Sequence, residues 1–380
     1  MARRHLLLPE LRTDDVPAIS DAVVALHSSD PVTVYLSTML RMANPSLEAV
    51  ASALYDDRSV IRHHAMRRTL WVGTPPVVRL MHAAATRKLI APERARTCKL
   101  LAANGIDDPE AWLADACEQV LEVLHRVGPL SARALGEQVP ALRHPLDMAP
   151  GKSYATTASA HTRVLLQLGF EGRIVRVRPG GSWVNGAYTY AAMDSWLPGG
   201  LDGPDGLDEK EAACELAGRW LLRFGPATTR DLQWWMGWTI SLTRHALAGC
   251  RAVEVDLDGV PGWMAAEDEP AEPAPPWVAV LPSLDPTVMG WKERGWYLPD
   301  AAADAFDSNG NAGATIWVDG RVVGAWAQTR DGDLRTHYFE RVAVARRWEA
   351  EARLAELAGM VGDTRFTMRF PGRIHGSLVV

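Results

Sequence analysis

The sequence is poor in cysteine, and its cysteines form none of the spacings typical of metal or disulfide proteins. The four thiols lie far apart and form no Cys-x-x-Cys pair, at Cys98, Cys117, Cys214 and Cys250. This spacing argues against a zinc ribbon and a disulfide scaffold, and it is typical of reduced thiols in a cytosol.

Long apolar runs are also missing. No run approaches the roughly 20 residues that a membrane span needs, and the run at residues 6–8 stops at Pro9, too early for a secretory signal. We therefore expect a cytoplasmic protein without a membrane partner.

Several enzymatic motifs are absent. The run Pro150-Gly151-Lys152-Ser153 resembles the end of a phosphate loop, but Leu146 stands where the first glycine is required. There is no His-Glu-x-x-His and no Gly-x-Ser-x-Gly, and the adjacent His63 and His64 would diverge by about 100° on a helix. Nucleotide hydrolysis and a metal site are thus not expected, and no cofactor is indicated.

The charge is unevenly distributed. The 380 residues carry a net charge of −6, with 47% hydrophobic and 23% charged residues, which is typical of a globular chain of two to four domains. However, the stretch from Arg58 to Lys99 contains ten Lys and Arg residues and one acidic residue, and the stretch from Arg126 to Arg178 contains eight Lys and Arg residues and three acidic residues. Local positive fields can attract a polyanion despite an acidic total, although such charges also occur on solvated helix faces.

An internal repeat organises the middle of the chain. Gly-Pro-Leu-Ser-Ala-Arg-Ala-Leu at 128–135 matches Gly-Pro-Ala-Thr-Thr-Arg-Asp-Leu at 225–232 in four of eight positions. Each copy follows an amphipathic helix (111–126 and 209–224), and Ser131 and Thr228 are natural helix caps. A further helix (155–168 and 240–248), a glycine cap (Gly169 and Gly249) and a strand pair follow. This is the order of a winged helix, a module that binds DNA or, alternatively, other proteins.

The flanking regions complete the predicted organisation. Residues 16–42 predict two helices broken at 28–31, residues 46–55 a helix, 58–64 a helical stretch, 69–72 a strand and 75–104 a helical pair. After an acidic, proline-rich linker, Asp-Gly turns at 319–320 and 331–332 predict hairpins, followed by a helix at 344–358 and a last strand at 364–370. We predict an α+β chain with a winged-helix domain carrying the candidate catalytic motif (1–110), a second (111–197) and a third (208–266) winged helix, and a small β-barrel or sheet (277–380).

The segment from His27 to Asp30 lies at a predicted helix break and carries the candidate chemistry. His27 can act as a base or a donor, Ser29 can orient water, and Asp30 can accept a proton or stabilise positive charge. Hydrolysis of an N-glycosidic bond needs little more than a positioned water. The alternative is that His27 is a helix-end histidine and that Ser29 and Asp30 only cap the next helix.

Several longer stretches of the sequence resemble a known protein family. Leu-His-Ser-Ser-Asp-Pro at 26–31, the run at 55–62, Ala-Met-Arg-Arg-Thr-Leu at 65–70 and the phrases at 284–294, 309–313 and 318–324 resemble, in order, the AlkZ/YcaQ-like family of bacterial DNA glycosylases. The resemblance covers about residues 16 to 370. It implies three tandem winged helices in a C-shape and the release of bulky alkylated purines or the unhooking of interstrand crosslinks, with genotoxin self-resistance as one role.

The catalytic motif departs from the family pattern. The family carries Gln-x-Gln or Gln-x-Asp before Asp-Pro, and the matching positions here hold His27, Ser28 and Ser29. We expect a monofunctional DNA glycosylase acting as a monomer on double-stranded DNA in the bacterial nucleoid. The alternatives are an inactive DNA-binding regulator or damage-binding protein, and a protein scaffold.

Basic residues are predicted to contact the duplex. These are Arg58, Arg62, Arg67, Arg68, Lys152, His161, Arg163, Arg176 and Arg178. A solvated surface is the alternative for them. Trp234, Trp235 and Trp238 are expected to pack in a core rather than to stack on bases.

Overall fold

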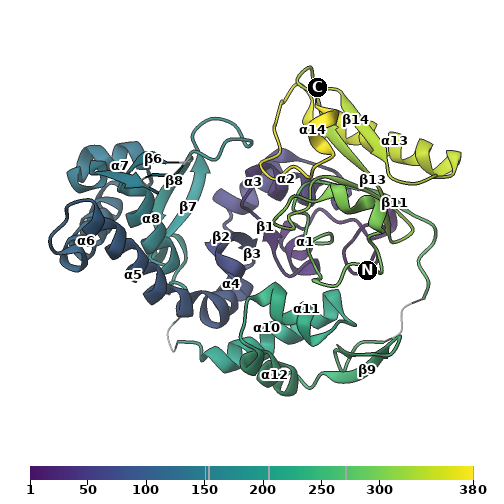
Figure 1. The fold of residues 1–380 in the computed structure, drawn as a ribbon, viewed down its shortest axis with the longest axis horizontal. Helices are drawn as coiled ribbons and strands as arrows, with labels where there is room; N and C mark the ends of the chain where they lie inside the picture. Colours follow the sequence, from purple (N-terminus) through teal and green to yellow (C-terminus); the bar gives the residue numbers. More distant parts are fainter. Residues whose placement is uncertain (150, 153–154, 204–205, 270–271, 380) are drawn as a thin grey trace.

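A computed structural model describes residues 1–149, 151–152, 155–203, 206–269 and 272–379. Within these ranges, three segments share one order of helices and strands, and a C-terminal sheet with a long helix follows (Figure 1). The second segment lies at the left of the view, the first in the middle, the third below, and the C-terminal sheet at the upper right. Pro150 and Ser153 of the run compared with a phosphate loop, and parts of both linkers, lie outside the described residues.

The first segment forms a three-stranded antiparallel sheet in the order β1-β3-β2. Its elements are α1 (Val16–Ala22), β1 (Leu26–His27), α2 (Pro31–Met39), α3 (Leu47–Tyr55), β2 (Ile61–His64) and β3 (Leu70–Gly73). The helix predicted to continue to Leu26 ends at Ala22 instead, because Val24 has a φ of 64° and the chain leaves the helix there. The predicted helical stretch at 58–64 was also wrong, because pairing with β3 makes residues 61–64 a buried strand.

A helical bridge follows, as predicted for residues 75–104. It consists of α4 (Pro75–Met81), a π-helical turn (His82–Thr86) and α5 (Arg87–Ala103). Cys98 and Leu101 of α5 belong to the hydrophobic core of the second segment, so this helix joins the first two segments.

The second segment repeats the pattern, with the sheet order β4-β8-β7. Its elements are α6 (Pro109–Val127), β4 (Leu130–Ser131), α7 (Ala132–Gln138), β5 (Pro145–Met148), β6 (Thr156–Ser159), α8 (His161–Phe170), β7 (Ile174–Pro179), β8 (Tyr188–Ala192) and α9 (Met193–Trp196). Ser131 caps α7 by accepting from the N–H of Ala134 at 3.2 Å. The predicted helix start at residue 155 was wrong, because residues 156–159 pair with β5.

The third segment is the shortest. Its elements are α10 (Glu209–Phe224), α11 (Thr229–Met236), α12 (Ile240–Gly249), β9 (Val253–Leu257) and β10 (Val260–Met264). Thr228 and Asp231 form a capping box at the start of α11, as the predicted cap at Thr228 requires. Ala227 forms an antiparallel bridge with Trp263, in the position of the first strand of the other sheets.

The predicted glycine caps were wrong in position. Gly169 and Gly249 lie inside α8 and α12, and the left-handed residues follow later, at Gly172 (φ 71°) and Arg251 (φ 56°). Helix α8 runs one residue past Gly169 and α12 ends at Gly249, and in both the left-handed residue lies two or three positions after the glycine.

The C-terminal region forms an open sheet in the order β11-β12-β13-β14 rather than a closed barrel. Its elements are β11 (Val278–Leu281), β12 (Thr315–Val318), β13 (Arg321–Gln328), β14 (Leu334–Tyr338), α13 (Val344–Val361) and α14 (His375–Leu378). Asp319 and Gly320 have φ of 48° and 90°, as a tight hairpin requires. The last strand predicted at 364–370 was wrong, since this segment has no regular structure.

Short 3-10 helices complete the chain, at Pro9–Leu11, Met66–Arg68, Pro140–Arg143 and Asp300–Ala305. One large hydrophobic core joins the first segment, the third segment and the C-terminal sheet, whereas most of the second segment packs around a core of its own.

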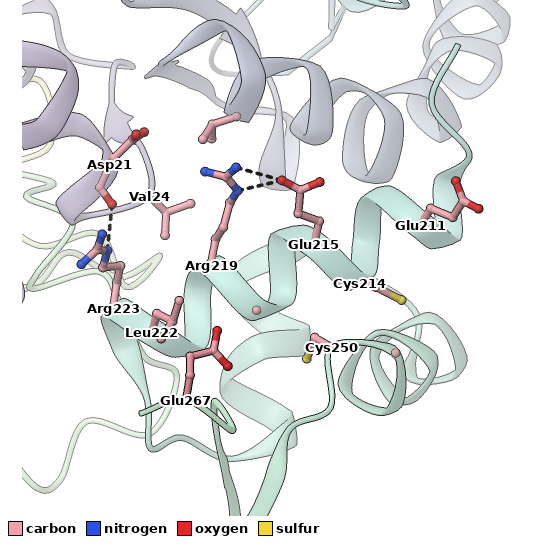
Figure 2. Close-up of a pocket in the computed structure, with 13 residues that line it drawn as sticks. Asp21, Val24, Glu211, Cys214, Glu215, Arg219, Leu222, Arg223, Cys250 and Glu267 are labelled. Atoms are coloured by element: carbon pink, nitrogen blue, oxygen red, sulfur yellow. Dashed lines mark hydrogen bonds and ion pairs between the residues drawn. The ribbon is translucent and has the colours of Figure 1, made fainter. Parts of the chain in front are cut away.

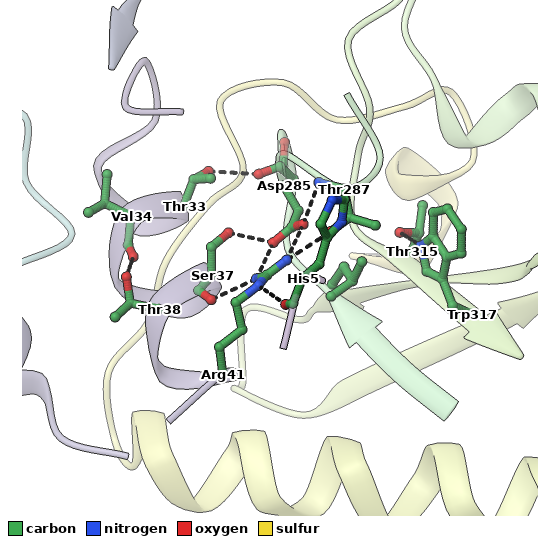
Figure 3. A network of polar contacts seen from close by, with 12 residues as sticks. His5, Thr33, Val34, Ser37, Thr38, Arg41, Asp285, Thr287, Thr315 and Trp317 are labelled. Atoms are coloured by element: carbon green, nitrogen blue, oxygen red, sulfur yellow. Dashed lines mark hydrogen bonds and ion pairs between the residues drawn. The ribbon is translucent and has the colours of Figure 1, made fainter. Parts of the chain in front are cut away.

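A buried ion pair connects the C-terminal region to the first segment (Figure 3). Arg41, at the end of α2, donates from both terminal nitrogens to the carboxylate of Asp285, each at 2.9 Å, and both side chains are fully buried. Ser37 and Thr287 complete the network by hydrogen bonds to the carboxylate and the guanidinium respectively. The motif-bearing segment is thereby held in fixed register with the C-terminal region.

Candidate functional site

His27 lies on β1, directly across from Trp71 of β3. Its side chain is 4% exposed, and the two ring centroids are 4.8 Å apart in an edge-to-face arrangement. Burial, and to a lesser extent the charge of Arg67, lower the pKa of His27 to about 3. The imidazole is therefore neutral at physiological pH.

The neighbouring backbone fixes which ring nitrogen of His27 carries hydrogen. The N–H of Ser29 donates to Nδ1 of His27 at 3.4 Å. Because an amide nitrogen can only donate, Nδ1 is the acceptor and Nε2 carries the hydrogen. A neutral imidazole in this form donates a hydrogen bond through Nε2, as a side-chain amide does, but cannot accept a proton there.

The two serines play different parts. Ser28 is buried, its Oγ accepts from Nε of Arg62 at 2.7 Å, and its N–H donates to the carbonyl of Leu70 at 2.8 Å. Ser29 is half-buried.

Asp30 occupies a structural position. One carboxylate oxygen accepts from the N–H of Val32 at 3.2 Å and caps α2, and the other accepts from the N–H of Arg369 at 3.0 Å. Burial raises the pKa of Asp30, and the two backbone hydrogen bonds act in the opposite direction. Asp30 thus matches the helix-cap alternative and also attaches the C-terminal segment to the motif.

Arg58 and Arg62 hold the second segment against the first. The Arg58 guanidinium lies 4.1 Å from the ring centre of Trp196. Arg62 is buried, lies 4.5 Å over the ring of Tyr188, and approaches the carbonyl of Arg176 at 3.4 Å. The Arg62 guanidinium is enclosed between the two segments, which restricts its access to a phosphate on the surface.

Arg67 and Arg68 contact the third segment and helix α5, respectively. Arg67 is half-buried with its guanidinium 4.1 Å over the ring of Trp234, and burial, then the charge of Arg294, lower its pKa to about 10. Arg68 is exposed but forms an ion pair with Glu93 of α5. The arginine-rich run therefore ties the segments together, a role that the charge pattern did not reveal.

The predicted DNA contacts of the second segment are more accessible. Lys152 is exposed, whereas His161 and Arg163, in the first turn of α8, are half-buried, and burial lowers the pKa of each. Arg176 is half-buried about 6 Å from the rings of Tyr188 and Tyr190. Arg178 is exposed and pairs with Asp56 at 2.8 Å.

Two of the three tryptophans pack in the core, as expected, whereas Trp234 is half-buried beneath the guanidinium of Arg67. Trp235 is fully buried, with its ring 5.1 Å from Trp71, and Trp238 is buried and donates to the carbonyl of Ala84 at 2.9 Å. Trp71 was not singled out in the sequence, although it lies in the predicted strand and positions both His27 and Trp235.

None of the predicted site residues lines a cavity of about 670 Å³ that lies between the first and third segments (Figure 2). It lies along α10 and carries Asp21, Glu211, Glu215 and Glu267, while Arg219 is paired with Glu215 at 2.8 Å. These four acidic side chains outnumber the two arginines of the lining, Arg219 and Arg223, so the net charge of the cavity is negative and disfavours phosphate.

Within the part of the chain that the structure describes, no group of three or more His, Cys, Asp or Glu side chains could hold a metal ion. His63 and His82 make a ring-nitrogen contact of 3.0 Å, and among the described residues no further His, Cys, Asp or Glu completes a metal-binding group with them. In the same described ranges, no helix is both long and apolar enough to cross a membrane.

Comparison with known proteins gives one family and one similar structure. A family model described as "DNA glycosylase AlkZ-like" matches residues 21–361, which include β1 and most of the C-terminal region. Among solved structures, the Streptomyces sahachiroi DNA glycosylase AlkZ is similar, with a TM-score of 0.70 and 21% sequence identity over 97% of this chain and 96% of that one. No curated protein matches the chain.

Proposed function

Because this chain belongs to the AlkZ-like DNA glycosylase family, we propose that it hydrolyses the N-glycosidic bond of bulky alkylated purines, or of crosslinked purines, in duplex DNA. The observation that carries the site assignment is the state of His27, a neutral imidazole that presents a hydrogen-bond donor. It stands where the family has an amide side chain, which can also donate.

In the proposed reaction, His27 and Ser29 orient the attacking water. The bond between sugar and alkylated base breaks with oxocarbenium character, so that a positioned water and polar groups nearby supply most of what the protein must provide. The bond electrons leave with the base and neutralise the positive charge of the alkylated ring. The water oxygen attaches to the sugar carbon, and the proton that this water loses passes to the solvent. Asp30 holds the motif in place through its cap and its contact with the N–H of Arg369.

We propose a monofunctional mechanism. The first lysine in the sequence is Lys88, and its ammonium group donates to the carbonyl of Gly237 at 3.0 Å. The motif itself therefore contains no amine to form a Schiff base with the sugar.

Duplex binding is proposed to involve all three segments as winged helices in a C-shape, with domain limits near residues 110, 197, 208 and 266. The first segment has the order helix, strand, helix, helix, strand, strand. The second has the same order with the β5–β6 hairpin inserted before its third helix, and the third has a shortened form, which supports this assignment. The exposed Lys152, Arg58, Arg68 and Arg178 are the better candidates for phosphate contact, and the enclosed Arg62 is the weaker one. We further propose a monomer that acts on the nucleoid in a bacterial cytoplasm.

A second function is favoured by the burial of the motif. His27 and Asp30 are 4% and 2% exposed, as expected of a DNA-binding regulator or damage-binding protein without activity. The test is to incubate the purified chain with alkylated or crosslinked duplex and cleave abasic sites with alkali. Strand cleavage that is lost in the double variant His27→Ala/Ser29→Ala supports the enzyme. Duplex binding without strand cleavage supports the regulator.

Self-resistance to a genotoxic natural product is part of the proposal. An enzyme that removes bulky adducts protects a cell that makes the alkylating compound. Deletion of the gene in its own organism should then raise sensitivity to one class of DNA-alkylating agents, and unchanged sensitivity would argue for a different role.

A further inference from the structure

A smaller cavity, of about 250 Å³, lies between the first segment and the loop that connects β7 to β8. Helices α2 and α3 contribute Tyr35, Glu48 and Tyr55, and the loop with its preceding strand contributes Arg178 and Trp183. Nothing in the sequence analysis pointed to Tyr35 or Trp183.

Aromatic rings from both segments form the walls of this cavity. Tyr35 and Tyr55 are buried, and Trp183 is half-buried. The ring centres of Tyr35 and Trp183 are 5.3 Å apart with 49° between the planes, and the Arg178 guanidinium lies 5.0 Å over Tyr55. Aromatic walls supplied by two different elements suit a flat ring system.

The rim of the cavity is polar and open to solvent. Glu48 and Arg178 are both exposed, and together they offer an acceptor and a set of donors, which suits the mixed edge of a nucleobase. Arg178 is already paired with Asp56, whereas among the described residues Glu48 forms no ion pair. The carboxylate of Glu48 is therefore the group at the rim that can attract a cationic ring, whereas the buried Arg62 behind Tyr55 adds a positive charge to the cavity wall.

The size of the cavity limits the ligand. Its volume is below the roughly 300–1,000 Å³ typical of sites for drug-sized molecules. One heteroaromatic ring system fits, and a bulky substituent on that ring has to remain outside, toward the solvent-exposed rim.

Two contacts connect the cavity to the motif. Arg62 donates to the hydroxyl of Tyr55 at 3.4 Å and to Oγ of Ser28 at 2.7 Å. Trp183 also lies 6.2 Å from Phe366, in the segment whose Arg369 N–H binds Asp30. The cavity wall is thus one side chain, Arg62, away from Ser28 of the motif, and it contacts the segment that binds Asp30.

We propose that this cavity receives the ring of the alkylated purine once the nucleotide has left the base stack, with Tyr35 and Trp183 as its walls. The inference rests on the proposed function and names where its substrate binds. Alkylation of a purine ring nitrogen in DNA places a positive charge on the ring, and electron-rich aromatic rings attract cations. Extrusion of a target base into a pocket is the usual way for enzymes to reach it.

The experiment measures binding of 7-methylguanosine, a cationic alkylpurine nucleoside, to the full chain by calorimetry, with guanosine as the uncharged control. We expect 7-methylguanosine to bind at least about tenfold more tightly than guanosine. Trp183→Leu and Tyr35→Leu should each weaken binding by about tenfold or more, whereas Trp183→Phe, which keeps a ring, should retain most of it. The matched control is Trp348→Leu, at a side chain that is 68% exposed on α13, and it should bind like the unaltered chain.

Absence of binding, equal binding of both nucleosides, or unchanged binding in Trp183→Leu would overturn the inference. Base release from alkylated duplex, measured on the same variants, separates this outcome from failure of the proposed function. Selective binding without base release leaves the cavity assignment standing and removes the enzyme. Base release together with unchanged binding in Trp183→Leu removes the cavity assignment and leaves the proposed enzyme standing.

Discussion

The N–H of Ser29 donates to Nδ1 of His27 across 3.4 Å, so the imidazole keeps its hydrogen on Nε2. The ring can then act as a donor that positions water or substrate, in the manner of the amide that the family carries at this place. It does not need to change protonation state during the reaction.

From this relationship we predict that His27→Gln retains activity and His27→Ala does not. The glutamine amide can replace the Nε2–H donor, so single-turnover base release should remain within about tenfold of the unaltered rate, whereas loss of the donor should cost about 100-fold or more. The measurement is alkali-revealed strand cleavage under single-turnover conditions. If glutamine is as damaging as alanine, the imidazole has a role other than donation.

Acid should destabilise the fold because several histidines are buried in their neutral form. Burial lowers the pKa of His27 and His64 to about 3 and that of His82 to about 4, against about 6.5 in an unfolded chain. Between these values the unfolded state binds protons that the folded state does not, so stability falls as the pH decreases from about 6.5. Each of the three histidines should cost roughly 2 kcal/mol between neutral pH and about pH 5.

The check is the free energy of unfolding in urea as a function of pH. His64→Phe provides the matched variant, because His64 is buried, stacks at 4.8 Å on Phe170, and has an Nδ1 without a partner among the described residues. A phenyl ring preserves the packing and removes the titration. In this variant the slope of the free energy of unfolding against pH should decrease by the equivalent of about one bound proton. An unaltered slope would mean that His64 does not contribute to the loss of stability in acid.

Breaking the buried pair of Arg41 and Asp285 should destabilise the protein by about 3–5 kcal/mol, because the remaining charge is buried without its partner. Asp285→Asn is the single change, and Arg41→Met/Asp285→Leu removes both charges and should lose less. Glu340→Gln, in the exposed pair with Arg321, serves as the control and should cost at most about 1 kcal/mol. Urea unfolding measures all three, and a double variant as unstable as the single one would argue against the unpaired-charge explanation.

Salt dependence of duplex binding should separate accessible cations from enclosed ones. Lys152 is exposed, and if it contacts a phosphate, Lys152→Ala should reduce the slope of log affinity against log salt by about 0.9. Arg133→Ala, at a side chain that is 91% exposed on α7, tests whether any exposed cation has this effect. Fluorescence anisotropy over a range of salt concentrations gives the slopes. Equal changes for the two variants would indicate a general charge effect rather than a contact at Lys152.

Local chemistry explains which elements could be predicted. Ser131, Thr228 and Asp30 cap helices because their side chains accept from the next free backbone N–H groups, which is a property of neighbouring residues. The turn at Asp319 and Gly320 is likewise set by its two residues. By contrast, residues 61–64 and 156–159 form strands only because partner strands lie beside them, and no local signal shows such a partner.

The sequence by itself determined the family, the repeated order of elements, the N-terminal helix caps, the Asp-Gly turn and the position of the motif at 27–30, because these depend on short-range chemistry and on sequence runs preserved in order. Only the tertiary structure decided what surrounds each side chain. Segments distant in the sequence bury Arg62, which therefore connects two segments, and His27, which therefore stays neutral and can donate a hydrogen bond. Burial sets the charge and the available partners of such a group, and its neighbours in the sequence do not determine this burial.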